Sequence, residues 1–424
     1  MRRSHRRHYR GRKPRMQVRS SHRQRVQRMW NSQERAMDNS KDIILMRYLG
    51  ELIRAQLENR TPQAIPDTIT YEELEQIAYS AQMPYMILGA LIRLPLTQEQ
   101  AQSCRNALKT STLKTLLQVQ IADRLQEKLE EAGIRNQVLK GAVMKHIYPR
   151  PELREMSDID FMIYEDDFTD TDRIVEEAGF VKVQAIKHHV IYQKAPFLTL
   201  EMHWDLYEKT VDKSQYMYYK DQFRAVPAEG KKYTYEFSRE NFYVYMISHM
   251  AKHFYENGCG IRNLVDIYVF NQKYGHSIDR TQVEQELKKC GILNFERQMS
   301  ELALIWMENR KCSKFYVNLF RYMIDCGIYG KSENGIWSQL CKQNAPQQKK
   351  SFNLTYYFPT AQYMKEYYPW LEGKEGLLPL AWLCRGVHGL LHRDSMERAR
   401  TLKDREKYRM MMEIYHNLNL NFVK

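Results

Sequence analysis

The sequence lacks any apolar run long enough to form a transmembrane helix, which requires about 20 residues. The longest candidate, Leu377 to Leu391, is broken by Cys384-Arg385-Gly386. The N-terminus is positively charged but has no apolar segment after it. We therefore expect neither a secretory signal nor a membrane span.

Paired cysteines are also missing. Seven cysteines are scattered over 424 residues, and no two of them form a C-x-x-C pair. This odd, dispersed set argues against a disulfide framework and against a zinc ribbon. It favours reduced thiols in the cytoplasm.

The chain has little excess of positive charge outside the N-terminus, although its net charge is +14. Residues 1–35 hold thirteen Lys and Arg against one acid, and the other residues are nearly balanced, with 52 basic and 50 acidic side chains. With few apolar residues, the segment 1–36 is expected to be a disordered basic tail. One interpretation is an arm that contacts nucleic acid or another anionic surface. The alternatives are a solvated extension and a true translation start at Met37.

The rest of the chain divides by its patterns into three predicted regions, 37–133, 134–237 and 238–424. The first and last show helical spacing of apolar residues, and the segment from Gln98 to Ala132 is predicted to be one long helix ended by Gly133. Thr70 and Glu73 have the spacing of a capping box.

The middle region has a mixed pattern. It predicts strands and helices in the following order: a strand at 134–139, a turn and helix at 140–148, a strand at 159–164, a helix at 166–179, and β-rich runs at 180–186, 189–195 and 198–204. Four or five strands with two helices fit residues 134 to about 208. The expected fold class is therefore α+β, with a small mixed sheet between two helical regions.

Two aspartates interrupt an apolar stretch, MSDIDFMI, at residues 156–163. Side chains alternate faces along a strand, so Asp158 and Asp160 share one face and Ile159 and Phe161 share the other. Carboxylates this close repel each other unless a cation lies between them. Mg²⁺ or Mn²⁺ is the natural choice, because both prefer oxygen ligands. The alternative is a chance pair at an exposed strand edge.

A later strand supplies a third acid. In LTLEMHW, Glu201 and His203 share a face, whereas Leu200 and Met202 share the opposite face. Three carboxylates can hold two metal ions that clamp the attacking and leaving oxygens in nucleotidyl transfer. His203 either lines this site or is a buried polar residue with a partner.

A predicted strand-to-helix turn precedes the aspartates. Gly141 lets backbone amides approach a phosphate at the positive end of a helix, and Lys140 adds a point charge. Arg154 is a further candidate for the phosphates, and Ser157 is placed to support the turn or to approach a ligand. The alternative for Gly141 is a helix start that needs a small residue.

The segments LKGA, YP, LREMSDIDFMI, EEAGF and LEMHWDL follow one another between about residues 138 and 205. Together they resemble the bacterial uncharacterised nucleotidyltransferase family of the polymerase-β-like superfamily. The superfamily pattern is a glycine-containing turn, a D-x-D strand and a third acid on a later strand. The stretches SHMAKHFYENGCGIRNLVDI and YFPTAQYMKEYY are also similar to parts of the family.

The resemblance implies a nucleotidyltransferase core at residues 134–237. It also implies metal-dependent transfer of a nucleoside monophosphate from an NTP, ATP being slightly favoured, with release of pyrophosphate. Asp158, Asp160 and Glu201 would be the catalytic metal ligands, and Gly141 the phosphate-binding turn. Two features depart from the better-known pattern, the Lys140-Gly141 order and a glutamate as the third acid.

The resemblance also favours a cleft position for a group of residues in the C-terminal helical region. His249 and His253 lie four residues apart on one helical face. A zinc-protease function is disfavoured, because the glutamate of H-E-x-x-H is absent. Together with Arg262 and Asp266, these histidines would position nucleotide or acceptor. The alternative is a set of structural contacts inside a helical domain.

Other functions remain open at this point. A glycosyltransferase also uses D-x-D to hold a metal and a nucleotide, but it predicts a βαβ region ahead of the motif and leaves Glu201 without a role. A binding or adaptor protein with a degenerate site is the non-enzymatic alternative. A toxin-like transferase acting on tRNA would give the basic tail a use. The acceptor is not indicated.

Overall fold

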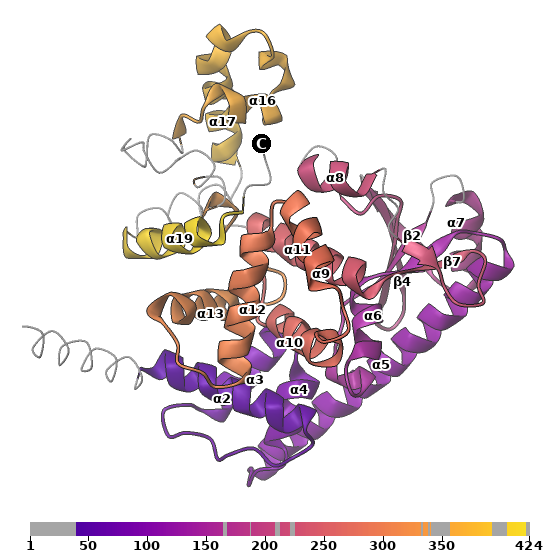
Figure 1. Cartoon of the computed structure of the whole chain (residues 1–424), viewed down its shortest axis with the longest axis vertical. Helices are drawn as coiled ribbons and strands as arrows, with labels where there is room; N and C mark the ends of the chain where they lie inside the picture. Colours follow the sequence, from indigo (N-terminus) through magenta and orange to yellow (C-terminus); the bar gives the residue numbers. More distant parts are fainter. Residues whose placement is uncertain are drawn as a thin grey trace, which may run out of the picture.

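The computed structural model describes residues 40–163, 168–186, 188–207, 213–220, 225–331, 334–337, 340, 357–391 and 405–420. The predicted basic tail, residues 1–36, lies outside this range. Helices and one mixed sheet make up the described part of the chain, which confirms the α+β class. Figure 1 shows the sheet at one side of the helices.

The first helices agree with the sequence pattern. They are α2 (Lys41–Leu57), α3 (Tyr71–Ser80), α4 (Pro84–Leu91) and α5 (Gln98–Glu131). The long helix α5 ends where Gly133 adopts a left-handed φ of 75°, as predicted. Thr70 caps α3 by accepting a hydrogen bond from the Glu73 amide. A full reciprocal capping box forms at Thr97 and Gln100 of α5.

The five strands and two helices that the sequence predicts between residues 134 and 208 are present in the described part of this range. These elements are β1 (Asn136–Val138), α6 (Lys140–Ile147), β2 (Ile159–Ile163), α7 (Phe168–Glu177), β3 (Val181–Ile186), β4 (His189–Lys194) and β5 (Leu198–His203), with a 3-10 turn at Pro151–Leu153. After α8 (Lys213–Lys220), two further strands, β6 (Ala225–Pro227) and β7 (Thr234–Phe237), extend the sheet. These two strands were not predicted.

The seven strands follow the order β3-β4-β5-β2-β1-β7-β6. β2 and β5 are neighbours and run parallel, whereas β1 pairs antiparallel with β2 on its other side. The two strands that carry the predicted acids therefore lie side by side in the middle of the sheet.

The two faces of the sheet have different coverings. Ile159, Phe161 and Ile163 pack with residues of α5 and α7 in one hydrophobic core. Met162, on the opposite face of β2, belongs to a second and larger core formed mostly by helices. The alternation predicted for the acidic strands is thus confirmed.

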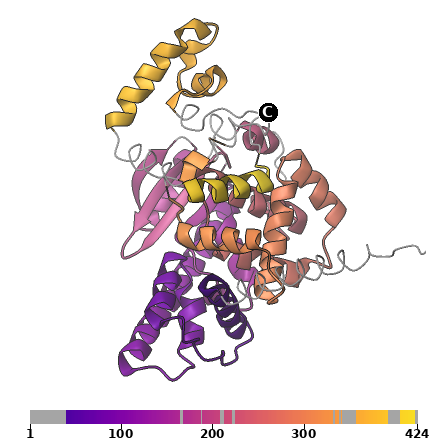
Figure 2. The same ribbon diagram turned by 90° about the vertical axis from the view of Figure 1, so that its left-hand side faces the viewer.

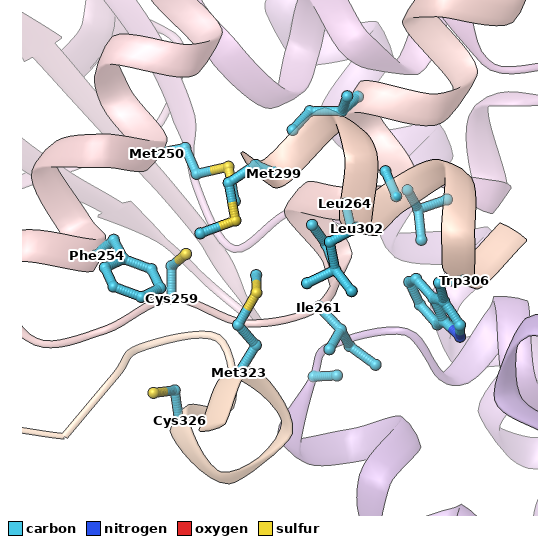
Figure 3. Packing of buried hydrophobic residues seen from close by; sticks show 14 of the residues in the cluster. Met250, Phe254, Cys259, Ile261, Leu264, Met299, Leu302, Trp306, Met323 and Cys326 are labelled. Carbon is cyan, nitrogen blue, oxygen red and sulfur yellow. The ribbon is translucent and has the colours of Figure 1, made fainter. Parts of the chain in front are cut away.

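The helices that follow the sheet are α9 (Arg239–Glu256), α10 (Arg262–Tyr274), α11 (Arg280–Lys289), α12 (Leu293–Met307), α13 (Lys314–Cys326), α16 (Ala361–Tyr367), α17 (Leu378–Leu391) and α19 (Arg405–Leu418), with 3-10 turns at Pro369–Leu371 and Glu375–Leu377. Ser238 caps α9 through the Asn241 amide. The larger core contains residues from α2 to α19, so helices from both ends of the chain share it. Figure 3 shows its centre, where Met250, Phe254 and Trp306 pack among sulfur-containing and aliphatic side chains.

Helices α16 and α17 have a small core of their own, which includes Tyr363, Met364 and Leu371. Figures 1 and 2 place them at one end of the molecule. Among the described residues, no helix combines the length and the apolar character needed to cross a bilayer. The boundaries at 36, 133 and 237 stay predictions.

Candidate active site

Asp160 and Glu201 are brought together by strand register. Parallel pairing of β2 with β5 places them directly opposite each other. His203 follows on the same face of β5, and its Nε2 lies 3.0 Å from Asp160 Oδ1 and 3.4 Å from Glu201 Oε2. The three side chains thus form one cluster, in which Asp160 and His203 are buried.

Lys140 supplies the positive charge that faces this cluster. Its Nζ lies 2.6 Å from Asp160 Oδ1. The residue stands at the start of α6 with a φ of 48°, and the preceding amide of Leu139 donates to the Asp160 carbonyl. Backbone and side chain therefore both tie the strand-to-helix turn to β2.

Proton affinities in the cluster follow from burial and these partners. Burial raises the pKa of Asp160, but the Lys140 ammonium and the hydrogen bond from His203 outweigh it, so that the pKa lies well below its usual range. Burial and the charge of Asp160 raise the pKa of Asp158 to about 6. Asp158 is the half-buried residue just before β2. The charges of Asp160, Lys140 and Glu201 all affect its pKa.

The turn at Gly141 is tightly packed. A Cβ added there would lie 3.1 Å from Met156 Cβ, closer than most real contacts. The packing favours glycine because α6 must approach the segment that leads to Asp158. This gives Gly141 a structural role, and its predicted contact with phosphate stays a prediction.

Arg154 and Asp266 form a buried ion pair. Arg154 Nε and Nη2 donate to the two Asp266 carboxylate oxygens over 2.7 and 2.8 Å, and the Tyr148 hydroxyl donates to the same carboxylate. The pair joins the segment before β2 to helix α10. The guanidinium is therefore already neutralised, and a contact between Arg154 and phosphate remains a prediction.

Arg262, at the start of α10, donates from Nη1 to Gln82 Oε1 and to the Glu155 carbonyl, each over 3.0 Å. Burial and the charge of Arg154 lower its pKa to about 10. The Ser157 hydroxyl donates to the same Gln82 oxygen over 2.7 Å. Arg262 is therefore held close to Ser157, one residue before Asp158.

His249 and His253 lie on one face of α9, with their Nε2 atoms 3.1 Å apart. Burial lowers the pKa of His249 well below its usual value, and the charge of Lys140 lowers it further. The cleft position of His249 and His253, and their role toward nucleotide or acceptor, stay predictions.

Some neighbours of the site were missed at the sequence level. His189 faces His203 across the β4–β5 pairing, with its Nε2 3.8 Å from Glu201 Oε2. The alternation of β4 could have indicated it, once β4 was paired with β5. Gln82 comes from the end of α3, and no local pattern in the sequence connects it with Ser157.

The donors suit a divalent cation. Ligand atoms of Asp160, Glu201 and His203 all lie within 4.8 Å of one another, and those of His188, His189 and His203 form a second such group. A set of carboxylate oxygens with one imidazole nitrogen suits Mn²⁺. The carboxylate oxygens alone suit Mg²⁺. These residues fit the predicted divalent metal, but Asp158, the first acid of the D-x-D pattern, belongs to neither group, and its role as a ligand stays a prediction.

Comparison with known proteins gives one match. The model of a family described as uncharacterised nucleotidyltransferase matches residues 68–308, more than half of the chain. The matched range contains α3 to α12 and the whole sheet. Searches of curated proteins and of solved structures found no match.

Proposed function

Because the chain belongs to the uncharacterised nucleotidyltransferase family, we propose that it transfers a nucleoside monophosphate from an NTP to an acceptor hydroxyl. The acceptor oxygen bonds to the α-phosphorus, the bond from this phosphorus to the bridging oxygen of the β-phosphate breaks, and pyrophosphate leaves. The hydroxyl proton passes to a carboxylate of the site or to water. The observation that carries the proposal is the pairing of Asp160 with Glu201 on neighbouring strands.

We assign Asp158, Asp160 and Glu201 to the binding of Mg²⁺ or Mn²⁺, with His203 as a neighbouring donor. When bound, the metal would neutralise charge on the attacking and leaving oxygens. Paired strands hold Asp160 and Glu201, so these two carboxylates need little reorganisation when the nucleotide arrives.

Positive groups of the chain would hold the triphosphate. Lys140 lies at the N-terminal end of α6, where backbone amides also favour an anion. Arg262 is a second cation beside Ser157, and its hydrogen bonds go to neutral oxygens. Arg262 can therefore turn toward phosphate without breaking an ion pair, whereas Lys140 would have to leave Asp160.

The acceptor is a free hydroxyl of a protein, a small molecule or an RNA end, and ATP is the favoured donor. Contact of residues 1–36 with nucleic acid would suit an RNA acceptor. The cytoplasmic location expected from the dispersed cysteines is part of the same proposal.

The test is transfer of label from each α-labelled NTP, with Mg²⁺ or Mn²⁺ and a cell extract as the source of acceptor. Wild-type protein should transfer label and release pyrophosphate, and Asp160→Asn should lower the rate by at least about a hundredfold. Asp170→Asn, which changes an exposed acid on α7, is the matched control and should keep the wild-type rate.

An absence of transfer from every NTP, together with unchanged metal binding in an Asp158→Ala/Asp160→Ala double variant, would overturn the proposal. It would favour an adaptor protein with a degenerate site. An acceptor fraction that loses activity on ribonuclease treatment would instead identify RNA as the acceptor.

A further inference from the structure

Tyr329 combines an exposed ring with a fixed hydroxyl. Its side chain is 73% exposed. Gln82 Nε2 donates to the hydroxyl over 2.6 Å, and the hydroxyl donates to Ser157 Oγ over 3.2 Å. Ser157 in turn donates to Gln82 Oε1. The three groups close a ring of hydrogen bonds, in which each donates once and accepts once from the others.

The loop that carries Tyr329 is anchored at both ends. The Ile328 amide donates to the Ser80 carbonyl over 2.9 Å, and the Lys331 amide donates to the Asn257 carbonyl over 2.8 Å. Gly330 has a φ of 68°, and a Cβ there would overlap the carbonyl oxygens of Asn257 and Gly258. The backbone therefore holds the ring in place instead of leaving it on a free surface loop.

A cation is attached to this ring of hydrogen bonds. Arg262 donates to the Gln82 oxygen that Ser157 also uses. An exposed aromatic ring and a guanidinium thus both contact Gln82, whose side chain also accepts from Ser157, the residue before Asp158. A ligand that carries both a flat ring and phosphates could stack on the tyrosine and pair with the guanidinium.

Space is available beside the ring. Tyr329 borders a pocket of about 560 Å³ between α2, α3, α13 and its own loop. Lys331 and Arg321 line this pocket together with Glu73 and Asp325. Donors and acceptors are therefore both present for the edge of a heterocycle.

We propose that Tyr329 is the stacking platform for the nucleobase of the bound NTP, and that Gln82 and Ser157 fix its ring beside the catalytic strand. The proposal rests on the nucleotidyltransferase function proposed above. Every base offers a π-face, so a stacking contact of this kind favours nucleotides over bare phosphate without choosing one base.

Calorimetric titration tests the platform without any acceptor. Wild-type protein with Mg²⁺ is titrated with ATP and with inorganic tripolyphosphate, which lacks base and sugar. Tyr329→Ala should weaken ATP binding roughly tenfold, the effect of one base–aromatic stack of about 1.4 kcal/mol, and should leave tripolyphosphate binding unchanged. Unchanged tripolyphosphate binding also shows that the variant is folded.

Two further variants separate the ring from its hydroxyl and from general surface effects. Tyr329→Phe keeps the ring and should retain most of the ATP affinity. Tyr367→Ala removes a similarly exposed tyrosine on α16 and should bind ATP like wild type.

Wild-type ATP affinity in Tyr329→Ala, or equal wild-type affinity for ATP and tripolyphosphate, would overturn the platform and leave the transferase function standing. Binding of neither ligand to wild-type protein would overturn the transferase function itself.

Discussion

The carboxylates of Asp158 and Asp160, two residues apart in the chain, hold protons with different strength. Lys140 and His203 favour the ionised form of Asp160, whereas burial and the charge of Asp160 raise the pKa of Asp158 to about 6. As the pH falls from neutral, Asp158 therefore takes up a proton first. The pair thus combines a carboxylate that stays ionised well below neutral pH with one that titrates closer to neutral pH.

Lys145 shows a large effect of burial on a single residue. It is fully buried on α6, and its Nζ donates to Thr115 Oγ1 over 3.0 Å. Burial, followed by the charge of Arg154, lowers its pKa to about 7. In the unfolded chain, a lysine titrates at its ordinary pKa of about 10.4. Between pH 7 and this value, the unfolded chain therefore binds more protons than the native state.

This difference predicts stability that rises with pH. Because the folded pKa is the lower one, the free energy of unfolding should increase by about 2 kcal/mol between pH 7 and pH 9 through Lys145. Urea denaturation of wild type and Lys145→Met at both pH values isolates the contribution. Equal pH dependence in the two proteins would show that the lysine is charged in the native state.

Helix α5 covers one face of the sheet, and its start is fixed by a reciprocal pair of hydrogen bonds. Thr97 accepts from the Gln100 amide, and the Gln100 side chain accepts from the Thr97 amide. These bonds satisfy donors that no helical carbonyl can reach.

Removal of this cap should be visible in stability. Thr97→Ala should lower the free energy of unfolding by about 1 kcal/mol, as measured by chemical denaturation. Thr110→Ala, at an exposed position inside the same helix, serves as the control, because it removes a threonine without a cap. A loss as large in the control would contradict the capping explanation.

Elements differed in how well the sequence indicated them. In residues 159–163 and 198–203, the side chains alternate between the two faces of the strand, and one face is apolar because it is buried in the core. This alternation assigned Asp160 and Glu201 to the opposite, polar faces. The short strands β6 and β7 were missed, since three or four residues hold too little pattern and depend on pairing with β1. His189, Gln82 and Tyr329 reach the site through pairings between distant segments, which one sequence does not encode locally.

At the scale of the whole molecule, the two helical regions meet directly. Trp306 on α12 is buried, and its Nε1 donates to the Met46 carbonyl on α2 over 2.8 Å. Gly50 on α2 lies against it, and a Cβ at this position would lie 2.8 Å from the Trp306 carbonyl oxygen. The contact joins residues more than 250 positions apart in the chain.

Gly50→Ala should therefore destabilise the protein, although alanine is the better helix former. The cost of forcing these backbones apart should be about 1–3 kcal/mol in the free energy of unfolding. Gly386→Ala on α17, where a Cβ meets nothing within 4 Å, should be neutral or slightly stabilising. Thermal or chemical denaturation of both variants checks the contrast, and a stable Gly50→Ala protein would refute close packing at this crossing.

The ion pair between Lys140 and Asp160 affects how a metal ion and a nucleotide would bind to the site. The buried carboxylate of Asp160 is balanced by the protein's own ammonium even when no metal ion is bound. With Asp158, Asp160 and Glu201 ionised, the three carboxylates and Lys140 carry a net charge of −2, which one divalent cation balances. The triphosphate then brings negative charge of its own, and Lys140 is the group placed to pass from carboxylate to phosphate as the nucleotide arrives.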